Sequence, residues 1–144
     1  MELVPEEEPY MSKSVTPLLT VDCIAFDGER NVLLVKRKNP PFQGKLALPG
    51  GFVETGETVE DACRREFAEE TGLQAGKLEL VGVYSNPDRD PRGHVVTIAF
   101  ATLIPGTCPT AGGDAVAATW VQDWENKGLA FDHACILNDA ERIG

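Results

Sequence analysis

Apolar and β-branched stretches alternate with polar turns along the chain, and they predict a fold rich in strands. Residues 18–26 (LLTVDCIAF) lead through an Asp-Gly turn at 27–30 into a second apolar stretch at 31–36, so this part predicts a hairpin. A last helix is expected from Asp132 to about Arg142, with Asp132 as its N-cap. Further strands are expected at residues 45–52, 77–84, 95–104 and 114–121.

One segment, from Thr58 to about Thr71, has the 3.6-residue period of a helix. Glu66 and Glu70 fall inside its apolar stripe and Glu69 lies at the flank, although carboxylates facing the protein body cost free energy unless they are neutralised. A divalent cation can neutralise them, because hard ions such as Mg²⁺ or Mn²⁺ prefer carboxylate oxygens. The alternative is a surface helix with a solvated charge run. The stripe itself consists of Val59, Ala62, Cys63 and Phe67.

The residues at both ends of this segment favour the same boundaries. Thr58 is the expected N-cap, with Asp61 three residues later as a variant of the capping box. Gly72 is expected to adopt the left-handed conformation that ends a helix. The helix is therefore predicted to end directly after the three glutamates.

Composition limits the classes of partner. The chain has 13 basic and 23 acidic residues in 144, a net charge of −10, which disfavours nucleic-acid polymers and anionic membranes. A small phosphorylated substrate remains compatible, because bound cations reverse the local field. The cysteines at positions 23, 63, 108 and 135 show no CxxC spacing, so we expect free thiols, a cytoplasmic location and no zinc site.

The length is that of one domain with a sizeable core. Residues 1–16 are acidic and contain prolines, so we expect a disordered tail and no signal peptide, with Met11 as an alternative start. Residues 17–144 are expected to form a single domain. No apolar run reaches transmembrane length.

The segment from Gly51 to Leu73 resembles the Nudix box, GX5EX7REUXEEXGU, at every fixed position. Gly51 is followed after five residues by Glu57, and after seven more by Arg65, which opens the sequence REFAEETGL. Similarity to the Nudix hydrolases extends from about Leu18 to Asp139. The resemblance implies an α/β Nudix fold, an α/β/α sandwich with a mixed central sheet.

The resemblance also implies a metal-dependent phosphoanhydride hydrolase. The resemblance pairs Glu57 with Arg65 and gives both residues orienting roles. Helix geometry by itself places Glu66 and Glu70 one turn apart, so that their carboxylates can converge. The general base stays open, with Glu69 or Glu66 favoured over Asp114. The expected metal ligands are the carbonyl of Gly50 and the side chains of Glu66, Glu69, Glu70 and Asp114, and the expected catalytic residues are Glu57, Arg65, Glu66 and Glu69. Two positions depart from the family pattern, with Leu46 in place of a common Trp and Ala117 in place of an acid.

A polar loop, SNPDRDPRGH at residues 85–94, points to a subgroup. A proline about fifteen residues beyond the box, here Pro87, resembles the ADP-ribose pyrophosphatases. Its basic residues are expected to contact a diphosphate or ribose, and the alternative is a rigid turn whose charges pair with each other. The loop at 37–43 has the same two interpretations, phosphate binding or a solvated turn. The candidate substrate-binding residues are Arg37, Pro87, Arg89, Arg92 and His94, whereas His133 is expected to be structural.

We therefore predict hydrolysis of ADP-ribose to AMP and ribose 5-phosphate with Mg²⁺, or with Mn²⁺ in its place. One alternative is a pyrophosphohydrolase of oxidised nucleoside triphosphates. Another is a non-catalytic domain that senses nucleotides, which the intact set of acids disfavours. A homodimer is a further expectation from the resemblance.

Overall fold

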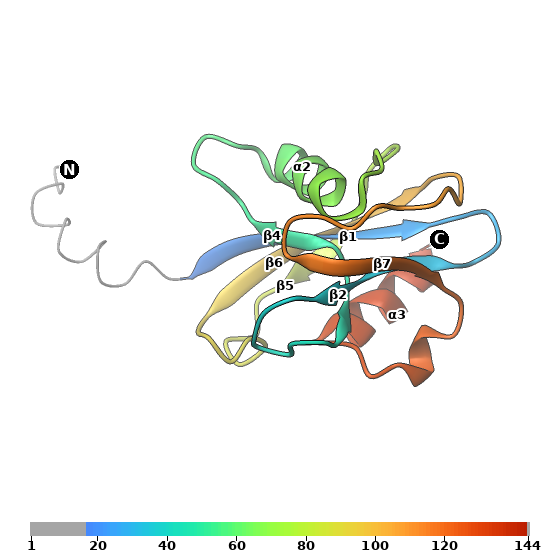
Figure 1. Cartoon of the computed structure of the whole chain (residues 1–144). Helices are drawn as coiled ribbons and strands as arrows, with labels where there is room; N and C mark the ends of the chain where they lie inside the picture. The colour runs from blue at the N-terminus through green and yellow to red at the C-terminus, as the bar shows by residue number, and fades with distance from the viewer. Residues whose placement is uncertain (1–16, 144) are drawn as a thin grey trace, which may run out of the picture.

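The computed structural model describes residues 17–143, and its centre is a seven-stranded mixed sheet with one helix on each face (Figure 1). The predicted α/β/α sandwich is therefore confirmed. The predicted tail at 1–16, with its alternative start at Met11, lies outside the described residues. The elements in chain order are β1 (Leu18–Phe26), β2 (Val32–Arg37), β3 (Leu46–Ala47), β4 (Gly50–Phe52), α2 (Val59–Thr71), β5 (Glu79–Tyr84), β6 (Val95–Leu103), β7 (Ala115–Val121), the 3₁₀ turn η1 (Trp124–Asn126) and α3 (His133–Ile143).

Strand β1 lies at the centre of the sheet. It runs parallel to β6 over all nine residues and antiparallel to β2 and β4, and the strand order is β3-β2-β1-β6-β5. Strand β7 pairs with β2. The parallel β1–β6 pair requires a long crossover, and that crossover contains α2.

The single strand expected at 45–52 is two short strands, which corrects the prediction. Strand β3 pairs with β2, and β4 pairs with β1, with a bend at Leu48 and Pro49 between them. Proline has no N–H to donate to a sheet ladder, so pairing is interrupted there. The bend moves the glycines of β4 onto the central strand.

Both predicted ends of α2 are confirmed. The hydroxyl of Thr58 accepts a hydrogen bond from the Asp61 N–H at 3.0 Å. Gly72 adopts the left-handed conformation, with φ 73°, and its N–H donates to the carbonyl of Ala68. The glutamates at the end of the helix are thereby held at fixed positions.

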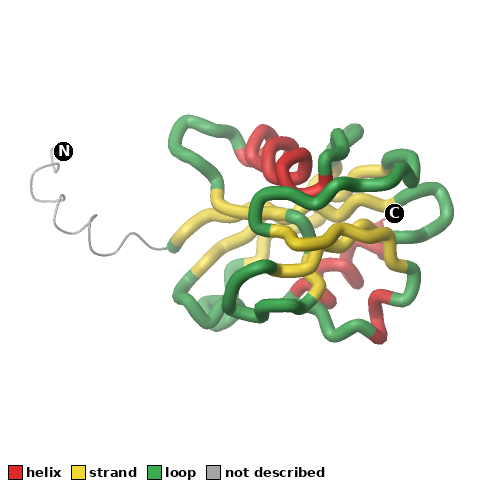
Figure 2. Tube along the Cα trace, in the orientation of Figure 1, coloured by secondary structure: helices red, strands yellow, loops and turns green. Residues whose placement is uncertain are grey.

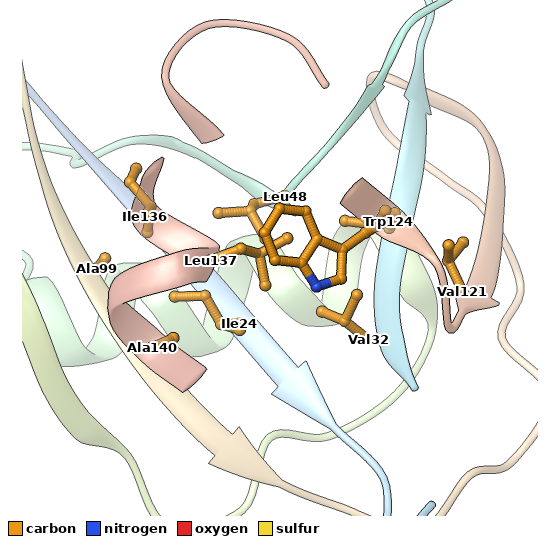
Figure 3. Packing of buried hydrophobic residues seen from close by; sticks show 10 residues of the cluster. Ile24, Val32, Leu48, Ala99, Val121, Trp124, Ile136, Leu137 and Ala140 are labelled. Atoms are coloured by element: carbon orange, nitrogen blue, oxygen red, sulfur yellow. The ribbon is translucent and has the colours of Figure 1, made fainter. Parts of the chain in front are cut away.

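Alternation along β1 divides the core into two layers. Val21, Cys23 and Ala25 face α2 with its Cys63, whereas Ile24 faces α3. Figure 2 shows the two helices on opposite sides of the strands. All four cysteines are free, as expected. No helix described between residues 17 and 143 is long and apolar enough to cross a bilayer. Figure 3 shows the layer on the α3 side, with Ile24, Val32, Leu48, Trp124, Ile136 and Leu137 in contact.

Candidate active site

A cavity of about 330 Å³ opens between the first half of β1, the end of β2, strands β3 and β4, helix α2 and the surrounding loops. It brings together most of the predicted site residues from distant parts of the chain. Pro87, His94, Glu57, Arg65 and Glu69 are not among its lining residues. The predicted residues that do line it are Arg37, Gly50, Glu66, Glu70, Arg89, Arg92 and Asp114.

One side of the cavity, which we call the acidic wall, consists of Glu66, Glu70 and Asp114. The Gly50 N–H donates to Glu70 Oε1 at 3.1 Å, and a side chain at Gly51 would collide with the Glu66 carboxylate. Burial, together with the nearby Asp114 charge, raises the pKa of Glu70 to about 8 and that of Glu66 to about 6. The protein thus holds carboxylates close together without enough positive charge.

Arg65 connects this wall to the loop before the helix. Its guanidinium donates to Glu57 at 2.6 and 2.9 Å, to Glu66 at 3.1 Å and to Glu69 at 3.3 Å, and it also reaches the Phe52 carbonyl at 3.1 Å. The hydrogen bonds from Arg65 lower the pKa of Glu57 to about 2. The orienting pair expected from the resemblance is therefore present in the structure.

The chemistry of these carboxylates suits a divalent cation, although their side chains do not point to one common position. In the part of the chain that the structure describes, no group of three or more His, Cys, Asp or Glu side chains is placed to hold a metal ion. Glu66 and Glu69 point to Arg65 instead, and the Glu69 side chain is 52% exposed. The donors are hard oxygens, and a cation would neutralise the buried charge of Glu66 and Glu70, whose pKa values burial raises.

The loop before β7 packs against the end of α2. The Thr110 N–H donates to the Thr71 carbonyl at 2.7 Å, and the Gly112 N–H donates to the Glu70 carbonyl at 3.3 Å. These bonds satisfy carbonyls that the helix end leaves unpaired. They also place Asp114, two residues later, beside the glutamates.

The loop at 85–94 lies across the cavity, and its charges are paired. Arg89 makes two hydrogen bonds to Asp132, at 2.7 and 2.9 Å, and its side chain is only 4% exposed. Arg92 binds Asp90 at 2.7 Å. Asp132 directly precedes α3, and its carbonyl accepts from the N–H groups of Cys135 and Ile136, so it stands at the predicted N-cap position. Its two carboxylate oxygens accept from Arg89. His94 lies near the Ser85 carbonyl, at 3.0 Å.

A second group of lining residues, Arg37, Arg92, Phe52 and Phe131, combines arginines with aromatic rings, and we call it the basic wall. Arg37 lies over the ring of Phe131, 4.9 Å from its centroid, and donates to the Pro41 carbonyl at 2.7 Å. Arg92 lies 5.6 Å from the ring centroid of Phe52. A negatively charged, partly planar ligand could therefore contact both kinds of group.

Asp22, a buried acid that lines the cavity from β1, was not among the residues predicted from the sequence. Asp22 lies in β1, is 6% exposed and accepts a 2.7 Å hydrogen bond from the Thr97 hydroxyl. His133 is also buried there, at 3.5 Å from Asp22. The available signal was an isolated acid at an inner position of an apolar strand, since buried carboxylates are rare without a partner.

The raised pKa of Glu70 predicts a pH effect on the metal-free protein. A folded pKa of about 8, above the ordinary value of 4.5, means that the folded state binds the proton more tightly, so stability is lost as pH rises from about 4.5 to 8. Glu70→Gln should remove this loss, which a pKa of about 8 against 4.5 sets at about 3 kcal/mol between pH 5 and 8. Thermal unfolding in a chelator measures it. The exposed Glu60→Gln is the control, and equal pH profiles for wild type and Glu70→Gln would contradict the prediction.

Comparisons with known proteins identify the family of this chain. A model of the NUDIX domain matches residues 16–139. An ADP-ribose pyrophosphatase of Methanocaldococcus jannaschii is 51% identical over 88% of this chain and 74% of its own. The NUDIX domain of Shewanella oneidensis NrtR, solved with ADP ribose, has a TM-score of 0.82 and 31% identity over 95% of this chain and 99% of its own. A bifunctional NMN adenylyltransferase/ADP ribose pyrophosphatase of Francisella tularensis, complexed with AMP and a Mn ion, has a TM-score of 0.79 and 26% identity over 98% of this chain and 46% of its own. The chain therefore belongs to the Nudix family.

Proposed function

We propose that this protein hydrolyses the pyrophosphate bond of ADP-ribose to AMP and ribose 5-phosphate, with Mg²⁺, or Mn²⁺ in its place. The observation that carries the proposal is that one cavity is lined both by the acidic wall and by the basic wall. A pyrophosphate between two sugars needs cations on one side and fixed positive charge on the other. The 51% identity to a protein named as an ADP-ribose pyrophosphatase supports this substrate.

Nudix hydrolases act with a divalent metal, and the acidic wall fits one. When bound, the cation supplies Lewis acidity to the phosphate oxygens and lowers the pKa of the attacking water. We assign Glu66, Glu69 and Glu70, the carbonyl of Gly50 and the carboxylate of Asp114 to its coordination. Because burial raises the pKa of Glu70, a cation must displace a proton from this carboxylate, so metal affinity should rise with pH.

The other residues of the box orient these acids. Arg65 holds Glu57 and thus ties the preceding loop to α2. Glu69 is the most exposed of the glutamates that contact Arg65 in α2, so its carboxylate can reach a water at the cavity mouth. We therefore favour Glu69, with Glu66 as the alternative, as the group that accepts the proton of the attacking water.

The basic wall binds the substrate in this proposal. Arg37 and Arg92 line the cavity and are placed to contact the diphosphate. Arg89 also lines the cavity, but its side chain is only 4% exposed and is held by Asp132, so we assign it to holding the loop in place. Arg92, although bound to Asp90, keeps 43% of its side chain exposed. Pro87 and His94 shape the same loop from outside the cavity lining, and their contact with substrate remains a prediction.

Arg37→Met should raise KM for ADP-ribose by about 10- to 100-fold and leave kcat within about threefold. A hydrogen bond to a charged group contributes about 1.5–3 kcal/mol, and we expect it equally in ground state and transition state. Lys38→Met is the matched control, because Lys38 is exposed and does not line the cavity. Steady-state kinetics measure both variants. Equal KM values for the two variants would remove Arg37 from the binding site.

The proposed function is tested by a substrate panel with Mg²⁺, scored by product identity: ADP-ribose, NADH, diadenosine polyphosphates, dGTP and 8-oxo-dGTP. AMP and ribose 5-phosphate from ADP-ribose, well above all other turnover, is the expected result. Faster release of pyrophosphate from a triphosphate would favour the nucleotide-sanitising alternative. Binding of ADP-ribose without turnover would favour the sensing domain. The homodimer remains a prediction, which sedimentation analysis tests.

A further inference from the structure

A buried histidine connects α3 to the floor of the cavity. His133 is the first residue of α3, and its side chain is only 6% exposed. Nδ1 accepts a hydrogen bond from the Leu48 N–H at 2.9 Å, across 85 residues of sequence. On the other side of the ring, Nε2 lies 3.5 Å from Asp22 Oδ1. Each ring nitrogen therefore has a different neighbour.

These neighbours determine the protonation of the ring. A backbone amide can only donate, so Nδ1 of His133 must carry the lone pair, and the proton of the neutral ring is on Nε2, facing the Asp22 carboxylate. Burial lowers the pKa of His133, which favours this neutral form. Asp22 is held in turn by the Thr97 hydroxyl at 2.7 Å. The ring is thus fixed in one orientation.

The amide that His133 binds belongs to the bend that supplies Gly50. At this bend Leu48 gives its N–H to His133, the Pro49 carbonyl accepts from the Cys23 N–H at 2.8 Å, and the Gly50 N–H donates to Glu70. The Leu48 side chain lies in the same core layer as Ile136 and Leu137 of α3 (Figure 3). Because Leu48 is outside the strand ladders, His133 is the partner that fixes the start of the bend.

We propose that His133 is a positioning residue, which sets the Leu48–Gly50 bend so that Gly50 and Glu70 present their oxygens to the metal. The proposal rests on the proposed function only in assigning these two residues to the metal. The pair of Asp22 and His133 then acts indirectly, because it holds the segment that carries a metal ligand and does not contact the metal itself. Removing a residue that holds a metal ligand in place typically changes metal affinity by about 10- to 100-fold.

Two substitutions separate the two contacts of the ring. Asn places its amide oxygen near the position of Nδ1, so His133→Asn can accept from Leu48 but loses Asp22. Gln reaches the position of Nε2, so His133→Gln can donate to Asp22 but leaves the Leu48 N–H without its acceptor. We expect His133→Gln to weaken Mn²⁺ binding by about tenfold and His133→Asn to stay within about threefold of wild type. Calorimetric titration of Mn²⁺ without substrate measures this, at a temperature where both variants are fully folded.

Hydrogen exchange of residues 46–52 without metal is the second readout. Faster exchange at the Leu48 amide in His133→Gln, but not in His133→Asn, is expected. Equal Mn²⁺ affinity in wild type and both variants, with only the melting temperature lowered, would overturn the proposal and leave a structural role. A larger loss in His133→Asn than in His133→Gln would overturn it too. Absence of ADP-ribose turnover in the wild type would contradict the proposed substrate, while the exchange measurement would still decide the role of His133.

Discussion

Glu66→Gln should lower kcat for ADP-ribose by about a thousandfold, equivalent to about 4 kcal/mol of activation free energy. Glu66 lines the cavity beside Gly51 and shares Arg65 with Glu57 and Glu69. Glutamine keeps the size and an accepting oxygen, so the loss isolates the negative charge. Without that charge, the acidic wall binds a divalent cation less tightly. The site then stabilises the negative charge that develops on the phosphates in the transition state less well.

The experiment needs kinetics as a function of Mg²⁺ and a control on the same helix. Glu66→Gln should raise the Mg²⁺ concentration for half-maximal activity as well as lower kcat. Glu60→Gln removes the same charge from the exposed first turn of α2, and we expect kcat within about twofold of wild type. An unchanged Mg²⁺ titration in Glu66→Gln would contradict its role as a ligand. Equal losses in both variants would show a general charge effect instead.

Asp132→Ala should lower the free energy of unfolding by about 3 kcal/mol, because it leaves the Arg89 guanidinium buried without its anion. The Arg89 side chain is 4% exposed and makes two hydrogen bonds to Asp132. Breaking a buried ion pair on one side costs about 3–5 kcal/mol, since the remaining charge is neither solvated nor neutralised. Asp132 is 27% exposed, so we expect a value at the lower end of this range. Denaturant unfolding measures the loss.

A double-mutant cycle separates the pair from other effects of the substitution. Arg89→Met combined with Asp132→Ala should be less destabilised than the sum of the single variants, because no unpaired charge remains. The exposed pair of Arg142 and Asp139, 3.7 Å apart with side chains 70% and 36% exposed, is the matched comparison. We expect Arg142→Met to change stability by less than about 0.5 kcal/mol. Additive effects at Arg89 and Asp132 would show that they are not coupled.

Much of the fold follows from local patterns. The strand at 18–26 has the bounds expected from its apolar residues, and α2 begins after Thr58 and ends before Gly72, as its cap residues predicted. Nonlocal pairing explains the main difference in the strands. The segment 45–52 reads as one strand, but it pairs with β2 and then with β1, and Pro49 interrupts the ladder between them.

The sequence by itself was enough to identify the acids of the Nudix helix as candidate metal ligands. Glu66 and Glu70 are one helical turn apart, and this spacing is a property of local geometry. The sequence also determined the pairing of Glu57 with Arg65 by resemblance to the Nudix box, and the structure contains that pair. The set of candidate ligands was therefore available without coordinates.

Only the tertiary structure decided which charged side chains are exposed to a ligand. Arg89 and Arg92 look equivalent in the loop at 85–94, and both line the cavity and are bound to acids. Arg89 is buried against Asp132, 43 residues away, whereas Arg92, bound to Asp90 in its own loop, is 43% exposed. The same holds for His133, whose partners Leu48 and Asp22 come from two other elements. Burial and long-range hydrogen bonds depend on how distant segments pack, and no local pattern in the chain encodes that packing.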